Sequence, residues 1–164
     1  MTIRAEPGGP GWTALQQVND AIRFGDLKAA AVLAANGLFG GQLWVGGEPE
    51  SRALLLGTGL GLLTSALLAL GAIVPRCEPA GPESLHHFDH VAARYARNSQ
   101  GFVTRWLATT ADEEATDRML AEHLWAANLV AHRKFSLVTW SIRLLVTALV
   151  VWAGAQLGQL ILAG

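Results

Sequence analysis

Three long stretches of this chain contain no charged side chain: residues 29–47, 53–75 and 144–164. Charged residues make up 15% of the chain, against roughly 25% in an average soluble domain. As α-helices, the stretches would extend roughly 28 to 34 Å, close to the ~30 Å hydrocarbon core of a bilayer. Helices satisfy their backbone polar groups internally, and these segments lack the alternation of barrel strands. The sequence therefore predicts an all-α membrane protein with three spans.

The first stretch is the least apolar of the three. It contains Asn36, Gln42 and several glycines, whereas the other two are rich in Leu, Val and Ile. A buried helical hairpin is the alternative interpretation of this stretch. The predicted fold is a two-span N-terminal helical hairpin, a cytoplasmic helical segment, and a C-terminal third span that is continuous with a long cytoplasmic helix.

The distribution of basic residues predicts the topology. Most of the 12 Lys and Arg residues lie between the second and third stretches, and only Arg52 separates the first two. By the positive-inside rule, the N-terminus and the central segment lie in the cytoplasm. The chain starts without an apolar signal-peptide core, so we expect no cleavage. The predicted divisions are a tail with an amphipathic lead-in helix (1–28), a transmembrane hairpin (29–75), a cytoplasmic helical sensing segment (76–143) and a C-terminal transmembrane helix (144–164).

Apolar residues from Leu120 onward recur at steps of three and four into the last stretch. This spacing favours one helix that runs from the cytoplasm through the membrane. Thr110 and Glu113 have the spacing of a capping box at its start.

Basic and aromatic residues of the central segment are candidates for nucleotide binding, because guanidinium groups bind phosphates and aromatic rings stack on bases. At the membrane surface, basic residues can instead simply fix topology and contact headgroups. The candidate nucleotide-binding residues are Arg94, Arg97, Arg105, Arg133, Lys134, Phe88 and Tyr95.

Each charge-free stretch contains a Gly-x-x-x-Gly pair, a spacing that lets two helix backbones approach closely. The chain has 18 glycines, so some pairs arise by chance. Polar side chains within the stretches, such as Asn36, Gln42, Gln156 and Gln159, should face other helices or a wet path. We expect tight helix association within or between chains, and a homo-oligomer. The candidate packing glycines are Gly37, Gly41, Gly57, Gly61, Gly154 and Gly158.

The sequence also bears on metal binding, disulfide formation, nucleic-acid binding and catalysis. His86 and His90 share a helical face at metal-ligand spacing, but a solvated face is the simpler interpretation. The single cysteine, Cys77, excludes an intrachain disulfide, and the formal net charge of −1 argues against a nucleic-acid partner. Because nucleophile elbows, phosphate loops and dinucleotide motifs are missing, we expect no enzyme, no catalytic residue, no metal and no cofactor.

Several short motifs follow one another in a fixed order along the chain. Ile22-Arg23-Phe24-x-Asp26-x-Lys28 precedes the first stretch, Phe88-Asp89-His90 lies in the central segment, and Arg133-Lys134-Phe135 precedes the last stretch. In this order they resemble the small transmembrane effectors of the Pycsar antiphage system. The resemblance implies a multi-pass protein of a bacterial inner membrane. Its implied ligand is a cyclic pyrimidine mononucleotide, cUMP or cCMP, made by a partner cyclase. Its implied effect is membrane disruption, followed by cell death or growth arrest.

The charged residues before the first stretch form a candidate switch or anchor. Arg23 and Asp26 lie three residues apart and can pair, and Lys28 can reach the headgroups. We hypothesise that this triplet anchors a resting state. The rival interpretation of the whole chain is a small ligand-independent membrane scaffold or holin-like interaction protein; a membrane protein that binds metal through His86 and His90 is a more distant one.

Overall fold

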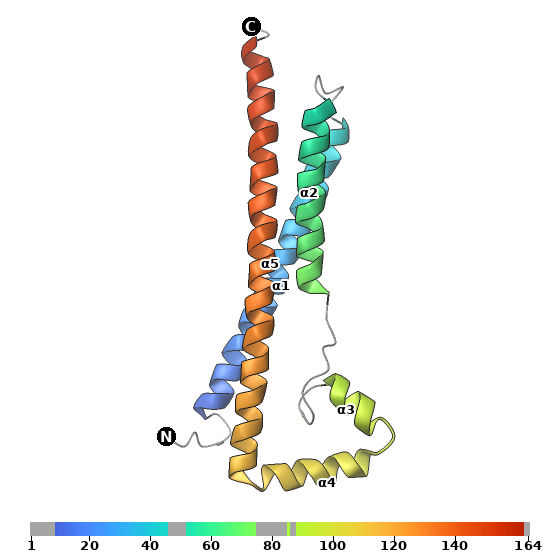
Figure 1. Cartoon of the computed structure of the whole chain (residues 1–164), viewed down its shortest axis with the longest axis vertical. Coiled ribbons are helices and arrows are strands. Elements are labelled where there is room, and N and C mark those ends of the chain that lie inside the picture. The colour runs from blue at the N-terminus through green and yellow to red at the C-terminus, as the bar shows by residue number, and fades with distance from the viewer. Residues whose placement is uncertain (1–8, 46–51, 75–84, 86–87, 163–164) are drawn as a thin grey trace. The chain divides into compact units, whose positions relative to one another are not determined.

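The computed structural model describes residues 9–45, 52–74, 85 and 88–162. Within these ranges the regular structure is α-helical, without a β-strand. The helices, in chain order, are α1 (Pro10–Val45), α2 (Arg52–Ile73), α3 (Phe88–Tyr95), α4 (Ser99–Thr110) and α5 (Glu113–Leu162) (Figure 1). The predicted all-α class is confirmed, and the predicted long helix is present as the continuous α5.

The chain divides into two compact units. One unit comprises residues 1–22 and 75–131, and we call its described part, with α3 and α4, the elbow unit. The other comprises residues 23–74 and 132–164, and we call its described part the three-helix unit. Helices α1 and α5 each contribute to both units. The predicted division at residues 28, 75 and 143 assigns functions to segments and stays a prediction.

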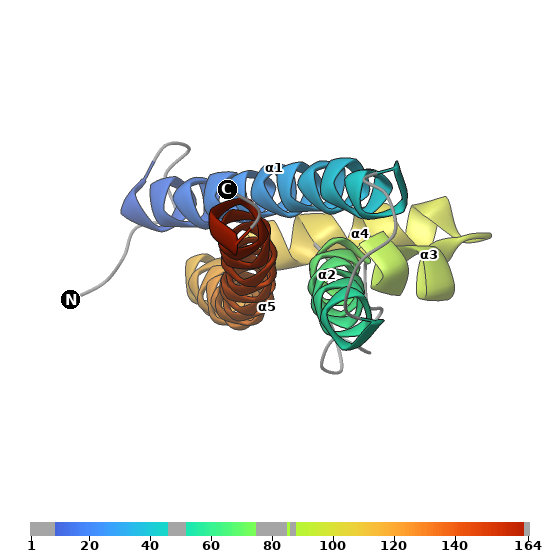
Figure 2. The same cartoon turned by 90° about the horizontal axis from the view of Figure 1, so that it is seen from above.

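The three-helix unit packs α2 against parts of α1 and α5 (Figure 2). The buried positions of α2 follow steps of four and three, the seam of helices that cross at a shallow angle. Most core side chains are small or medium in size, so the helix backbones can approach closely. The core consists of Ala29, Val32, Leu62, Ala69, Ala72, Val138, Leu145 and Ala148.

Among the described residues, two helices are long and apolar enough to cross a membrane. They are α2, with a mean hydropathy of 2.0 over its most apolar window, and α5, with 1.8. Large apolar side chains on both helices are exposed, among them Leu67 (59%), Val150 (65%) and Leu160 (76%). An apolar surface of this extent suits contact with lipid. The part of α1 that carries the first charge-free stretch is not among the two, so a third span stays a prediction.

The elbow unit contains two helix starts with side-chain caps. Asn98 caps α4, accepting a hydrogen bond from the backbone N–H of Gly101, where a Cβ would collide with the Asn98 side chain. Asp112 caps α5 by accepting from the N–H groups of Glu114 and Ala115. The predicted capping box is therefore wrong: Thr110 is the last residue of α4, and its hydroxyl donates to the carbonyl of Trp106. Thr and Asp are both favoured at helix starts. Because α4 extends through Thr110, it is Asp112 that caps α5.

Candidate functional site

The motif at residues 22–28 and the motif at residues 133–135 meet inside the three-helix unit. The Nζ atom of Lys134 on α5 donates to Oδ1 of Asp26 on α1 at 2.7 Å. The Lys134 side chain is only 17% exposed and that of Asp26 is 39% exposed. A short, partly buried ion pair of this kind is a charge-assisted hydrogen bond. It ties α1 to α5 at one end of the three-helix unit.

Lys28, two residues after Asp26 on α1, lies over two aromatic rings. The Nζ atom of Lys28 lies 4.7 Å from the ring centroid of Phe24 and 5.8 Å from that of Phe135, within the range of cation–π attraction. Gly25 is buried, and a Cβ at this position would lie 3.9 Å from the tip of the Phe135 ring. Together these residues form what we call the juxtamembrane cluster: Phe24, Gly25, Asp26, Lys28, Lys134 and Phe135.

In the juxtamembrane cluster, Asp26, Lys134 and Lys28 each make a contact that the sequence did not predict. Asp26 was expected to pair with Arg23 of its own helix, and the structure gives it Lys134 of α5 as a partner. The role of Arg23, Asp26 and Lys28 as a resting-state anchor stays a prediction. Lys134 was expected to bind nucleotide, which stays a prediction; in the structure its side chain joins α5 to α1. Lys28 was expected to reach the headgroups, and its ammonium group lies over two rings.

A second polar group lies in the core of the same unit and joins three helices. The Ser65 hydroxyl of α2 donates to the carbonyl of Ser141 on α5 at 2.8 Å, and the Ser141 hydroxyl donates back to the carbonyl of Ser65 at 2.7 Å. The Asn36 amide of α1 donates to the Ser65 hydroxyl at 3.0 Å. Both serines are 0% exposed and Asn36 is 6% exposed. We call these three residues the core polar cluster.

Sequence reasoning anticipated only part of the core polar cluster. Asn36 was expected to face other helices, and it does so. Ser65 and Ser141 were missed, although Ser65 falls on the buried seam of α2 with Leu62 and Ala69. Gln42 lines a small cavity of the three-helix unit together with Thr58 and Trp152. Gln156 is exposed on α5.

The glycine pairs receive mixed support within the chain. A Cβ at Gly61 would lie 3.3 Å from the Cβ of Ala148, so Gly61 permits close approach of α2 and α5. At the other five candidate positions an added Cβ would meet nothing within 4 Å: Gly37, Gly41, Gly57, Gly154 and Gly158. Their expected role in packing therefore concerns contacts between chains, and it stays a prediction.

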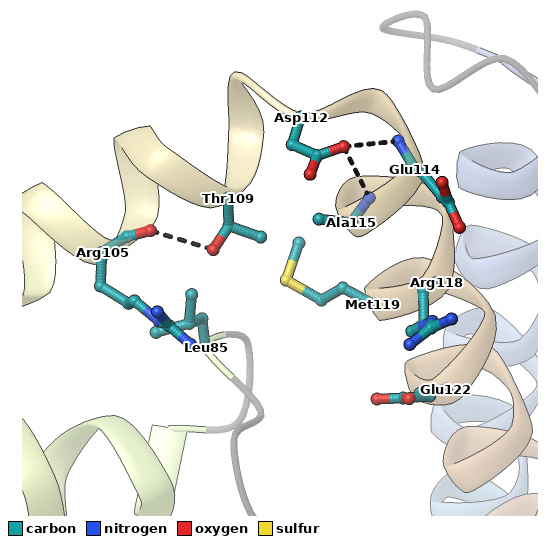
Figure 3. A pocket seen from close by; sticks show the side chains of 9 residues that line it. All are labelled: Leu85, Arg105, Thr109, Asp112, Glu114, Ala115, Arg118, Met119 and Glu122. Atoms are coloured by element: carbon teal, nitrogen blue, oxygen red, sulfur yellow. Dashed lines mark hydrogen bonds between the residues drawn. The ribbon is translucent and has the colours of Figure 1, made fainter.

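The elbow unit holds a groove of about 530 Å³ where α4 turns into α5 (Figure 3). Arg105 reaches it from α4, and Arg118 and Glu122 line it from α5 (Figure 3). This volume falls within the roughly 300–1,000 Å³ of small-molecule sites. Two guanidinium groups can bind an anion, and carboxylates can accept from hydroxyl or amino groups. The complete lining is Leu85, Arg105, Thr109, Asp112, Glu114, Ala115, Arg118, Met119 and Glu122.

Of the candidate nucleotide-binding residues, Arg105 is the one that lines this groove. Arg94, Tyr95 and Arg97 belong to the same unit, and the Tyr95 ring packs edge-on against Phe102 at 5.6 Å. Arg133 and Lys134 belong to the three-helix unit, and the side chain of Phe88 lies outside the described part. Arg118 and the groove carboxylates were missed, because only the turn between α4 and α5 brings them to Arg105.

The described residues contain no group of three or more His, Cys, Asp and Glu side chains that could hold a metal ion. His86 lies outside the described residues.

Comparisons with known proteins give one match. No curated protein and no solved structure matches the chain. The family model of the Pycsar effector protein domain, PycTM, matches residues 11–159, which include the juxtamembrane cluster, the core polar cluster and the groove. Since this match covers most of the sequence, the chain belongs to the Pycsar effector family, as a membrane effector of that antiphage system.

Proposed function

We propose that this chain permeabilises the bacterial inner membrane when a cyclic pyrimidine mononucleotide, cUMP or cCMP, binds to its cytoplasmic part. The match of the Pycsar effector domain to residues 11–159 carries the proposal. The exposed apolar surfaces of α2 and α5 support a bilayer as the site of action. A partner cyclase supplies the nucleotide during infection, and the resulting leak kills or arrests the cell.

The groove between α4 and α5 is the best-supported place for the nucleotide. The 3′,5′-cyclic phosphate carries one negative charge, which Arg105 and Arg118 suit, and Glu122 can accept from the ribose 2′-hydroxyl. The groove lies at the start of α5, and the same helix continues into the three-helix unit. A ligand that prefers one arrangement of the elbow unit therefore biases the arrangement of the helices in the bilayer.

The sequence supports the topology, the assembly and the partners that we propose. The N-terminus lies in the cytoplasm, the protein is multi-pass, and several copies assemble in the membrane. The chain catalyses no reaction and uses no resident cofactor. Its partners are the lipid bilayer, further copies of itself and the cyclic nucleotide.

K⁺ efflux from liposomes tests the proposed trigger. Purified protein in K⁺-loaded liposomes of bacterial lipid should release K⁺ on addition of cUMP or cCMP, because either nucleotide shifts the population towards the open arrangement. cAMP and linear UMP are the control nucleotides and should cause no release. Release at the same rate without nucleotide would contradict the trigger and support a ligand-independent, holin-like protein.

Substitution of the groove arginines tests the proposed site. A charged hydrogen bond contributes about 1.5–3 kcal/mol, so Arg105→Ala or Arg118→Ala should each weaken nucleotide binding by about tenfold or more. Isothermal titration calorimetry in detergent measures the dissociation constant. Arg52→Ala removes the same charge from the exposed start of α2, in the other unit, and should leave binding unchanged. Wild-type affinity in both groove variants would mean that the nucleotide does not bind in this groove.

The second candidate function is the ligand-independent scaffold or holin-like assembly. The five glycines whose added Cβ would meet nothing within 4 Å favour it, because they offer surfaces for close contact between chains. Such an assembly would leak in proportion to protein density and would ignore nucleotides.

A further inference from the structure

In the core polar cluster, hydrogen bonds join side chains of α1, α2 and α5. Ser65 and Ser141 exchange bonds with each other's backbone carbonyls, and their hydroxyl oxygens lie 3.1 Å apart. Around them the core consists of apolar residues, including Leu62, Ala69 and Val138. The cluster is therefore a polar contact enclosed by apolar packing.

Lipid changes what holds these helices together. Inside a bilayer, apolar contact between helices gains little, because lipid tails are as apolar as leucine side chains. Close packing and interhelical hydrogen bonds then carry the association. Between α2 and α5, close approach comes from Gly61 against Ala148, and hydrogen bonds come from Ser65 and Ser141. The reciprocal hydrogen bonds of Ser65 and Ser141 are therefore among the contacts that must break for α2 to separate from α5.

Two oxygens of the same core lack a partner. They are Oδ1 of Asn36, a residue 6% exposed, and Oγ1 of Thr58, a residue 4% exposed. A buried acceptor without a hydrogen bond carries a desolvation cost that a water molecule or a small cation would remove. These atoms point to water or a cation as the ligand of this core.

Polar groups follow one another along the three-helix unit. The Asp26–Lys134 pair lies at one position, the core polar cluster further along α1, and Gln42 and Thr58 line a small cavity beyond it. From Asp26 to Gln42 the rise of α1 is about 24 Å, most of the ~30 Å hydrocarbon thickness. These polar groups, with apolar core residues such as Val32 and Leu62 between them, mark a seam along much of the depth of a bilayer.

We propose that this seam is a closed path for water and monovalent cations, with the core polar cluster as its gate. When α2 separates from α5, the hydrogen bonds between Ser65 and Ser141 break. Their hydroxyl and carbonyl oxygens then bind water or cations instead. The leak then begins as a small, size-limited conductance rather than as rupture of the bilayer. The gate goes beyond the proposed function, and it rests on that function only for its natural trigger, the nucleotide.

A disulfide across the gate gives the direct test. Ser65→Cys and Ser141→Cys are combined with Cys77→Ser, so that the introduced thiols are the only ones in the chain. The 3.1 Å between the serine oxygens favours a bridge at this position. In liposomes loaded with K⁺, the oxidised variant should show no cUMP- or cCMP-dependent efflux, and dithiothreitol should restore it. Efflux at the wild-type rate from the oxidised, cross-linked protein would overturn the gate.

A second test needs no nucleotide. Ser65→Ala with Ser141→Ala removes the reciprocal hydrogen bonds and adds no bulk, and should raise nucleotide-free K⁺ efflux by about tenfold. Thr64→Ala is the matched control, because the exposed Thr64 hydroxyl donates to Leu60 of its own helix at 2.8 Å. This control should leak like the wild type. Efflux from the double variant equal to that of the control would overturn the gate.

The size of the released solutes separates a gate from rupture. K⁺ should leave liposomes that contain the double variant, while a co-entrapped dextran of about 10 kDa should stay inside. Simultaneous release of both would overturn the gate. If cUMP and cCMP have no effect on the wild type while the double variant leaks K⁺ alone, the proposed trigger fails and the gate stands. If a nucleotide opens the cross-linked protein, the gate fails and the trigger stands.

Discussion

Asp26→Lys should make the chain toxic in a bacterial host that has no cyclase, at an expression level at which the wild type is tolerated. The substitution replaces the 2.7 Å attraction between Asp26 and Lys134 by repulsion beside a lysine whose side chain is only 17% exposed. Two charges 4 Å apart interact by about 4 kcal/mol at an effective dielectric constant of 20. Because Asp26 is 39% exposed, solvent screening reduces the change to about 1–3 kcal/mol. A resting state destabilised by this amount opens roughly 5- to 150-fold more often.

Growth curves under a titratable promoter measure this effect, with immunoblots of the membrane fraction to match protein levels. The control is the charge swap, Asp26→Lys combined with Lys134→Asp, which restores opposite charges between α1 and α5. The swap should bring growth back towards that of the wild type. If the swap is as toxic as Asp26→Lys, the toxicity has a cause other than the ion pair. If Asp26→Lys is tolerated, the pair does not hold the resting state.

The helices themselves could be predicted from charge distribution. Stretches without charge coincide with α2 and with the C-terminal part of α5, because the hydrophobic pattern is local information. The partner of Asp26 could not be predicted in this way. Arg23 lies one turn away on the same helix, and the motif alone favours this local partner. Only the packing of α1 against α5 brings Lys134 to Asp26.

The polar contacts within the core show the same limit. Asn36 could be predicted to contact another helix, because an amide in an apolar stretch needs a partner. Ser65 and Ser141 could not, because serine is common in helices of membrane proteins. Their function as a contact depends on facing each other from two helices. The groove depends likewise on the turn between α4 and α5, which places Arg118 near Arg105. Patterns along one helix could therefore be predicted from the sequence, and side-chain contacts between helices could not.

Gly61→Leu should lower the stability of the folded protein by about 1–3 kcal/mol, the usual cost of overpacking a close contact. A Cβ at Gly61 would already lie 3.3 Å from the Cβ of Ala148, so the larger side chain forces α2 away from α5. Gly57→Leu is the matched control one turn away on α2, where a Cβ would meet nothing within 4 Å. Its stability should equal that of the wild type.

The two glycines separate packing within a chain from packing between chains. Unfolding by dodecyl sulfate in mixed micelles, followed by tryptophan fluorescence, measures stability, and cross-linking in native membranes measures assembly. Gly61→Leu should lose stability, because its contact is with α5 of the same chain. Gly57→Leu should keep its stability but lose cross-linked oligomers, if Gly57 serves contact between copies. Equal stability in the two variants would mean that α2 and α5 adjust to the added bulk, and that the close approach at Gly61 contributes little to holding the three-helix unit together.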